Sequence, residues 1–340
     1  MAQLPPVKYD NFKNGLITEG AVSRQYFPDD AVTESLNFHF DRLGCATLRP
    51  GITLLGNQLS GDILGLYEFR DSGSGSNNQI MAVNGTTAYY LSGGTWTSTR
   101  TGLTSGSKAE FATFVDQVFM VNSTEATAFW TGASGDSWST SGNATGSPTG
   151  KYIENFRSRL WIAGNSTNPD RLYYSSNPSA AGVITWDTSS TGQWIDISPS
   201  DGENITGLKR SKSYLLVFKP NHIYRVASIT STEPDPVINV GTWSHRSIVD
   251  AKDGTYFHHP TGFFKYVDGG AREISLPIVD IVKNITLANY SKVTGWTDGD
   301  HLYWAVGNVT ISGITYTNLV VRYTISSETW THYSYPRQFL

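Results

Sequence analysis

Short apolar runs recur along the chain, and each is followed by a turn and a second apolar or aromatic run. The clearest case lies between Arg159 and Ser175, where the apolar run 160–163 and the aromatic run 172–174 flank the turn 165–170. That turn holds Asn, Pro and Asp, which favour turn dihedrals or hydrogen-bond their own backbone. Aromatic residues suit a half-buried pleated surface. The segment therefore predicts a β-hairpin.

The same order of apolar and turn residues predicts six hairpins, which begin at Gln79, Gln117, Arg159, Ser213, Gly254 and His301. By subtraction, successive hairpins are 38, 42, 54, 41 and 47 residues apart. Repeats of about 40–50 residues built of short strands are typical of propeller blades.

Each hairpin has a further strand before it and, in most repeats, a fourth strand after it. The predicted preceding strands are 64–70, 110–115, 153–157, 205–210, 246–251 and 292–297. The predicted fourth strands often hold a tryptophan, namely Trp96, Trp138, Trp186 and Trp330. Four antiparallel strands per repeat form one blade. The pattern favours an all-β, six-bladed β-propeller; a seven-bladed propeller and an irregular β-sandwich are the alternatives.

The first 42 residues do not fit the repeat and are predicted to form an extended N-terminal arm, followed by the propeller at 43–340. The expected blades are 62–100, 108–142, 151–190, 203–243, 245–282 and 290–337. A propeller must close its ring, and a strand within 46–55 is predicted to close onto the last blade.

Residues 1–30 lack a periodic apolar face, so they cannot build a core alone. We expect them to lie along another surface, and we expect a chain without residues 2–30 to fold. At the centre of the clearest strand, at least one of Leu160 and Trp161 is expected to be buried between blades.

Composition narrows the function. Charged residues make up 16% of the chain and the net charge is −4, which argues against the basic surface that broad nucleic-acid attraction needs. The single cysteine, Cys45, excludes an internal disulfide and is expected to be a small buried residue. The N-terminal sequence does not predict a signal peptide, and no stretch has the length of a membrane span.

The pair His258–His259 is the strongest metal-like motif. Adjacent strand residues point to opposite faces, so the two rings cannot chelate one ion together. A polar turn edge is the favoured interpretation, and no metal or cofactor is expected.

A sialidase-like glycosidase is the natural enzyme alternative for a six-bladed fold. It would need several arginines around the axis and an acid near a nucleophile. The segment 92–96 is similar to the end of an Asp-box turn but lacks the aspartate. The loop acids are predicted to be turn residues; they are Asp201, Glu203, Asp298 and Asp300.

One basic cluster stands out, formed by Lys209, Arg210 and Lys212. It is interpreted as a solvated strand end. Its functional alternative is contact with DNA phosphate or with an acidic neighbouring subunit.

Several motifs in order resemble one family. Near the start they are Phe12–Leu16, Tyr26–Ala31, Asn37, Gly44 and Arg49–Gly51, and later Asn155–Trp161 and Tyr173–Ser176. In this order they resemble tail nozzle proteins of short-tailed bacteriophages, over about half the chain. The chain departs from the long nozzle proteins because it is shorter and lacks their large inserted domains.

The resemblance implies a β-propeller that assembles as a ring and retains or passes DNA. We therefore expect a non-enzymatic structural protein of a phage virion, a tail nozzle, hub or neck component, made in the bacterial host cytoplasm. The expected partners are copies of itself, other tail or neck proteins and, in passive contact, phage DNA, with no membrane. The alternative from another class is a lectin-like propeller that stacks sugars on exposed aromatic side chains.

Overall fold

The computed structural model describes residues 11–18, 26–40, 43–71, 78–230, 235–236, 239–267 and 270–336. The chain divides into two compact units. Unit 1 comprises residues 1–51, 220–222 and 237–340, and unit 2 comprises residues 52–219 and 223–236. Each unit is described by itself.

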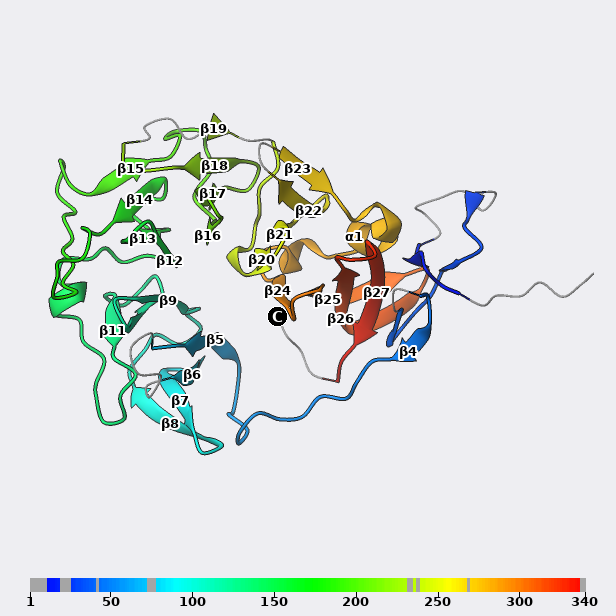
Figure 1. Ribbon diagram of the computed structural model, residues 1–340, viewed down its shortest axis with the longest axis horizontal. Helices are drawn as coiled ribbons and strands as arrows, with labels where there is room; N and C mark the ends of the chain where they lie inside the picture. Colours follow the sequence, from blue (N-terminus) through cyan, green and yellow to red (C-terminus); the bar gives the residue numbers. More distant parts are fainter. Residues whose placement is uncertain are drawn as a thin grey trace, which may run out of the picture. The chain divides into compact units, whose positions relative to one another are not determined.

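Each of the six predicted hairpins belongs to a separate antiparallel sheet (Figure 1). Five of these sheets have four strands with the hairpin in the middle, and the sheet of the hairpin at Gln117 has three. The six sheets are the blades of a six-bladed β-propeller. The described residues hold no seventh sheet of this kind, so the seven-bladed alternative is wrong. The one α-helix in the described part is α1 (Val279–Lys283).

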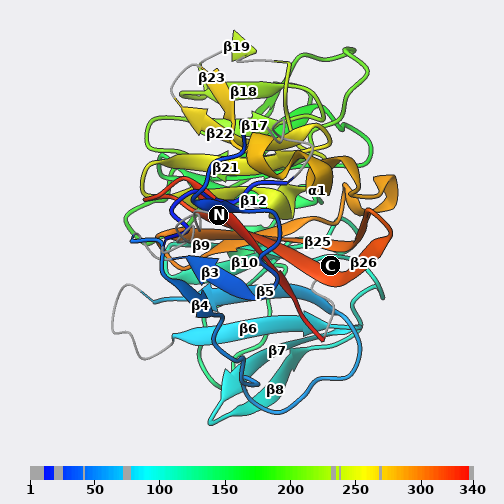
Figure 2. The same cartoon turned by 90° about the vertical axis from the view of Figure 1, so that its right-hand side faces the viewer.

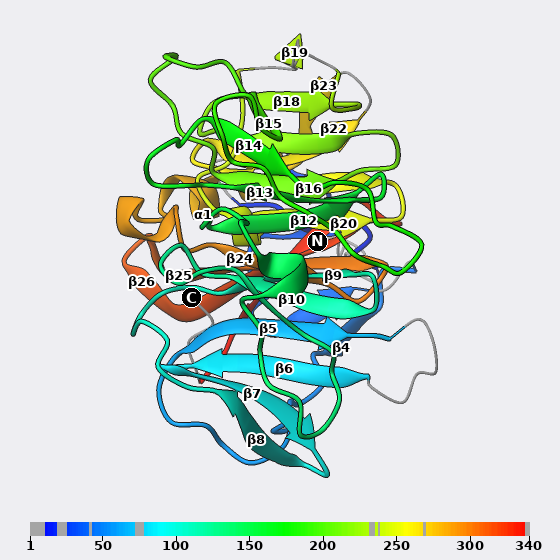
Figure 3. The ribbon, with the colours of Figure 1, turned by 90° about the vertical axis from the view of Figure 1, so that its left-hand side faces the viewer.

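Unit 2 holds the first four blades. They are β5 (Ile63–Phe69), β6 (Gln79–Asn84), β7 (Thr87–Ser92) and β8 (Thr95–Arg100); β9 (Glu110–Phe114), β10 (Gln117–Val121) and β11 (Ala128–Trp130); β12 (Tyr152–Phe156), β13 (Arg159–Ala163), β14 (Arg171–Tyr174) and β15 (Trp194–Asp196); and β16 (Gly207–Arg210), β17 (Leu215–Phe218), β18 (Ile223–Val226) and β19 (Asp235–Pro236). Figure 2 shows β5 to β8 as neighbouring strands, and Figure 3 shows the same for β12, β13 and β14.

Unit 1 holds the other two blades. They are β20 (Val249–Ala251), β21 (Gly254–His259), β22 (Gly262–Val267) and β23 (Gly270–Glu273); and β24 (Thr294–Thr297), β25 (His301–Ile311), β26 (Ile314–Thr324) and β27 (Thr329–Ser334).

The second strand of a blade is buried on both faces because it lies between two neighbouring blades. In β13, Leu160 packs with Phe119 of the second blade, whereas Trp161 packs with Leu215 of the fourth. Both side chains are buried, at 0% and 1% exposure, which confirms the expectation for this strand. A run of consecutive apolar residues is the pattern expected of a strand covered on both faces.

The link between first and second strands is a tight turn in two blades. Val115 and Asp116 both have positive φ (46° and 55°), as do Arg157 and Ser158 (47° and 56°). Two consecutive residues with positive φ are typical of a type I′ hairpin turn, whose twist matches that of the strands. These turns carry no glycine, so the sequence marks them only weakly.

The fourth strands differ most from the prediction. Trp96 and Trp330 lie in β8 and β27, but Trp138 and Trp186 lie outside strands. The second blade has three strands, completed only by an isolated bridge between Phe129 and Ser139. The fourth strand of the third blade is β15, beyond the predicted limit at residue 190. Because the outer strands of the blades are less buried, their sequences carry a weaker apolar pattern and are harder to predict.

The ring-closing prediction for residues 46–55 is also corrected. Within unit 1, β4 (Ala46–Leu48) pairs with β3 (Phe38–Phe40), and residues 49–55 form no strand. The segment that bridges to β27 is Leu36, in a parallel bridge with His332. Asn37 continues this contact, since its N–H donates to the His332 carbonyl at 2.9 Å. Residues 36 and 37, within the predicted arm, therefore meet the last blade in place of the predicted run 46–55.

The described parts of the arm contribute to the core of unit 1. β1 (Gly15–Leu16) pairs in parallel with β2 (Ala31–Val32). Leu16 is fully buried in the cluster that contains Trp330, and Gly15 lies so close that an added Cβ would meet the Thr329 Cβ at 2.9 Å. Removing residues 2–30 would uncover this cluster, so we expect the truncated chain to be less stable than the full chain. Residues 1–10 and 19–25 lie outside the described residues.

A second contact fastens the arm electrostatically. Glu34 Oε1 lies 2.9 Å from His332 Nε2, and the Tyr316 hydroxyl donates to Glu34 Oε2 at 2.6 Å. The contact with His332 lowers the pKa of Glu34 to about 2, against the opposing effect of burial, and Tyr316 adds to the lowering.

Cys45, expected to be buried, is exposed.

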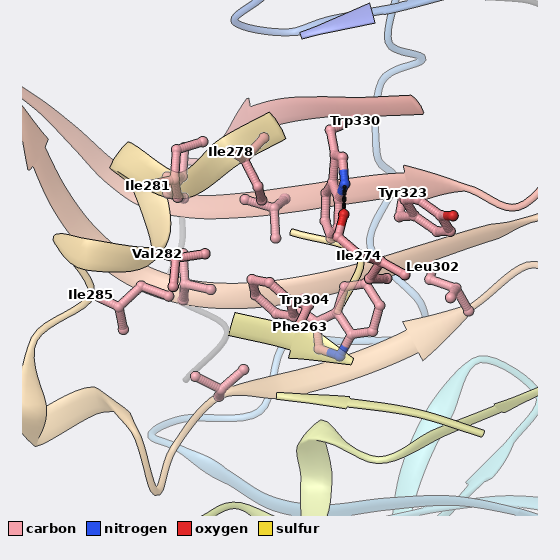
Figure 4. Packing of buried hydrophobic residues seen from close by; sticks show 14 of the residues in the cluster. Phe263, Ile274, Ile278, Ile281, Val282, Ile285, Leu302, Trp304, Tyr323 and Trp330 are labelled. Carbon is pink, nitrogen blue, oxygen red and sulfur yellow. Dashed lines mark hydrogen bonds between the residues drawn. The ribbon is translucent and has the colours of Figure 1, made fainter. Parts of the chain in front are cut away.

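The core of unit 1 is aromatic at its centre (Figure 4). The rings of Phe263 and Trp304 are 4.8 Å apart, and those of Tyr323 and Trp330 are 4.9 Å apart. The Trp330 indole N–H donates to the Ile274 carbonyl at 2.8 Å, so the buried ring leaves no polar atom without a partner.

Truncating either face of β13 should destabilise the protein strongly. We expect Leu160→Ala and Trp161→Ala each to lower the free energy of unfolding by about 3–5 kcal/mol, because each leaves a cavity between two blades. Urea unfolding followed by circular dichroism measures this. Leu287→Ala is the control, since Leu287 is exposed; equal stability of all three variants would contradict the packing described.

Candidate functional site

The first strands of the four blades in unit 2 lie side by side and are joined by polar side chains (Figure 1). The chain of contacts begins between β5 and β9. The Thr113 N–H donates to the Tyr67 hydroxyl at 2.9 Å, and that hydroxyl lies 2.8 Å from Thr113 Oγ1. Burial raises the pKa of Tyr67, and the bonds with Thr113 oppose the rise. The tyrosine is thus a neutral hydrogen-bonding group.

The chain continues through β12 to β16. The Asn155 amide donates to the Thr113 carbonyl at 2.6 Å, and the Arg210 guanidinium donates to Asn155 Oδ1 at 2.7 Å. Glu154 Oε2 accepts a longer bond from the Arg210 backbone N–H at 3.4 Å. One residue from each of four blades therefore takes part in a continuous hydrogen-bonded row, which we call the inner-strand row: Tyr67, Thr113, Asn155 and Arg210.

A close backbone approach lies beside this row. The Ala109 N–H donates to the Leu64 carbonyl at 2.9 Å. A Cβ added at Gly65 would meet the Ala109 carbonyl oxygen at 2.8 Å, so glycine is needed there for the first two blades to approach.

The predicted basic residues do not converge into one cluster. Lys209 and Arg210 are adjacent on β16 and therefore point to opposite faces. Arg210 is held by Asn155, whereas Lys212 lies exposed in the turn to β17. Nearby, the Arg157 guanidinium donates to the Ser213 carbonyl at 3.4 Å. Lys209 and Arg210 are adjacent in the sequence, but the alternation of side chains along β16 places them on different faces.

The charges of the inner strands nearly balance. Strands β5, β9, β12 and β16 carry three glutamates and two basic residues: Glu68, Glu110, Glu154, Lys209 and Arg210. A surface with this balance releases few counterions from a nucleic acid. It offers hydrogen bonds without strong attraction for phosphate.

The sequence did not reveal the buried lysine of unit 2. Lys219 is 0% exposed, and its ammonium donates to Asp170 at 3.0 Å, to Asp201 at 2.8 Å and to the Ser198 carbonyl at 3.1 Å. All three N–H groups are satisfied, so the lysine fixes two loops and is not free for chemistry. A buried lysine must be paired with carboxylates. In the sequence, the one indication of this site was an aspartate in each of the two partner loops, Asp170 and Asp201.

Two of the loop acids, Asp201 and Asp298, accept hydrogen bonds within turns, as predicted. Asp201 Oδ1 accepts from the Glu203 N–H, and Asp298 Oδ1 accepts from the His301 N–H. Burial would raise the pKa of Asp201, but the Lys219 bond helps to hold it below its ordinary value. No nucleophile with an adjacent base is formed by these acids.

The paired histidines depart from the expectation of a polar turn edge, because both are buried in β21. His259 Nδ1 accepts from the Thr261 N–H at 3.2 Å, so it does anchor the turn. His258 is fully buried beside Phe263 and Tyr290, and neither ring nitrogen has a hydrogen-bond partner. Burial lowers the pKa of His258 to about 3.

In the described residues, no group of three or more His, Cys, Asp or Glu side chains is placed to hold a metal ion. In the same residues, no helix has both the length and the apolar character needed to cross a membrane.

Comparison with known proteins gives a fold likeness only. No family model matches the chain, and no curated protein matches it. A computationally designed protein, Ika8, shares 10% identity over 88% of this chain and 90% of its own, with a TM-score of 0.44. YCF48 from Cyanidioschyzon merolae shares 12% identity over 81% and 86%, with a TM-score of 0.48. BamB from Moraxella catarrhalis shares 10% identity over 80% and 85%, with a TM-score of 0.42. These values are too low to inform function.

His258 should make stability fall in acid. Its pKa is lower in the folded than in the unfolded chain, so below about pH 6.5 the unfolded chain binds a proton that the folded chain does not. Between pH 6.5 and pH 5 this costs roughly 2 kcal/mol of unfolding free energy. The variant His258→Leu should lose this part of the pH dependence, measured by urea unfolding at both pH values. Phe257→Leu, its buried and non-titrating neighbour, should keep it; identical slopes for His258→Leu and the wild type would disprove the assignment.

Proposed function

We propose that the protein is a non-enzymatic structural component of a phage virion, a tail nozzle, hub or neck ring protein. It associates with copies of itself in a ring and docks other tail proteins. The resemblance of its ordered motifs to tail nozzle proteins motivates the proposal, and the exposed apolar segment described next carries it.

Large apolar side chains are concentrated and exposed between residues 43 and 66, which we call the apolar segment. Leu43 and Leu48 are exposed in unit 1, and Ile52, Leu54 and Leu55 are exposed in unit 2. Two further members, Ile63 and Leu66, lie on β5. Within unit 2 the segment exposes five large apolar side chains. Exposed apolar side chains gathered in this way are typical of protein–protein contacts.

We assign this segment to contact with a second copy of the chain. Most soluble oligomers are formed by identical subunits with closed symmetry, and a head-to-tail contact that closes gives a ring. The inner-strand row fits the same role, since balanced charge and satisfied hydrogen bonds offer DNA little to adhere to.

A lectin-like role has less support. Four of the tryptophans, Trp130, Trp161, Trp304 and Trp330, are fully buried and cannot stack on a sugar. Trp243 is 39% exposed, and its ring packs edge-on against Tyr290. The half-buried Trp194 already has one face covered, since the Arg171 guanidinium lies 3.6 Å from its ring centroid. For a sialidase-like site, the predicted loop acids Asp201 and Asp298 are engaged in turn hydrogen bonds.

Sedimentation velocity of the purified chain tests the assembly. We expect a discrete oligomer with ring-shaped particles in negative-stain images. Replacing Leu54 and Leu55 together by serine should shift it to monomer, with unchanged circular dichroism, because both side chains are exposed. The control replaces Leu276 and Leu287, which are equally exposed outside the segment, and should leave the oligomer intact.

A wild-type chain that stays monomeric at all concentrations, or an unchanged oligomer after the Leu54 and Leu55 replacements, would contradict self-association. The virion role is tested separately by immunogold labelling of particles from the source culture. Label at the tail or neck is expected, and unlabelled particles would refute that part.

A further inference from the structure

Arg322 is a buried cation without a counter-ion. It lies on β26 in unit 1 and is 4% exposed, and its Nε and Nη1 atoms have no hydrogen-bond partner. Among the described residues it forms no ion pair. The cost of burying this charge cannot be avoided by deprotonation, since the arginine guanidinium remains charged in proteins.

The side chains around Arg322 are aromatic and hydroxylated. Tyr303 on β25 and Thr331 on β27 are its direct cross-strand partners, so all three point to the same face. Tyr333 lies on that face too, opposite Val320. Burial raises the pKa of Tyr333, and the positive charge of Arg322 and a hydrogen bond with its guanidinium oppose that rise, so the two side chains are in contact. Nε and Nη1 are the guanidinium atoms left without a partner.

The same face extends in both directions. Trp296 on β24 stacks on Tyr303, with ring centroids 5.3 Å apart and planes 7° apart. At the other end Tyr335 lies next to Tyr333, and the Arg49 guanidinium lies 4.3 Å above the Tyr335 ring. The face therefore holds two guanidinium groups among four aromatic rings.

The carboxylate that contacts Tyr303 is already engaged. Asp298 accepts from the Tyr303 hydroxyl at 2.9 Å and lies 2.9 Å from His301 Nδ1. It is not in ion-pair contact with Arg322. Burying a charge without a partner costs several kcal/mol, so an anion that reached Arg322 would remove a large penalty.

We propose that this face of the last blade is a binding site for a small oxyanion of the phosphate or carboxylate class. Nε and Nη1 of Arg322 donate to the oxyanion, and the hydroxyl groups of Tyr303 and Tyr333 lie beside it. Charge-assisted bonds from a buried guanidinium to an oxyanion are among the stronger hydrogen bonds in proteins. The proposal is independent of the assembly role, because Arg322 and its cross-strand neighbours Tyr303 and Thr331 lie outside the apolar segment.

Inorganic phosphate and acetate are the probes, each compared with chloride at equal ionic strength. Phosphorus NMR line broadening measures phosphate binding, and thermal unfolding measures stabilisation by either anion. We expect the melting temperature of the wild type to rise by about 3–6 °C at saturating oxyanion. A larger rise with phosphate than with acetate assigns the site to phosphate, and the reverse assigns it to a carboxylate.

Arg322→Met should bind at least 10-fold more weakly and lose the stabilisation, while melting at or above the wild-type temperature without oxyanion. Arg272→Met is the matched control, since Arg272 is exposed and paired with Glu328; it should respond as the wild type does. Should Arg322→Met not fold, Arg322→Lys keeps the charge and removes Nε, and it should still weaken binding. No response of the wild type to either anion, or equal responses of wild type and Arg322 variants, would overturn the proposal.

Discussion

The fold depends on the second strand of each blade being covered on both faces. No strand ladder joins one blade of unit 2 to the next, because each sheet is complete in itself. Neighbouring blades are therefore held mainly by side chains. In β13 one residue serves each neighbour, since Leu160 packs toward the second blade and Trp161 toward the fourth. This requirement explains why the second strands carry consecutive apolar residues.

Polar contacts add direction to this packing. Apolar packing alone tolerates sliding of one blade along another, whereas a hydrogen bond fixes two strands at one register. The inner-strand row does this from Tyr67 to Arg210, and Lys219 does it for the loops at Asp170 and Asp201. Each of these groups is satisfied within unit 2. Arg322 and His258 in unit 1 are not, and they mark where charge or protonation can change stability.

The sequence predicted the hairpins because their pattern follows from burial on both faces. The segment 159–175 is clear since two apolar runs flank an Asn–Pro–Asp turn. The outer strands of the first and last blades were predicted, whereas those of the second and third blades were not, and Trp138 and Trp186 show why. Each indole N–H is bonded, to Thr99 and to the Asn143 carbonyl respectively, so these residues pack from loops without a strand period.

Long-range polar pairing was the other source of error. Leu36 and Asn37 contact β27, which lies nearly 300 residues later in the chain. No local sequence pattern in the arm predicts this contact. The burial of His258 and Lys219 was missed for the same reason. The basic residues Lys209, Arg210 and Lys212 were adjacent in sequence, but the alternation of β16 and the bond to Asn155 separate them.

A double-mutant cycle between Asn155 and Arg210 tests most directly whether side chains join neighbouring blades. The single variants Asn155→Ala and Arg210→Ala and the double variant are compared by urea unfolding, with Lys212→Ala in place of Arg210→Ala as the uncoupled pair. The account predicts a coupling free energy of about 0.5–3 kcal/mol for Asn155 with Arg210, and additivity for Asn155 with Lys212. Additive effects in both cycles would contradict it.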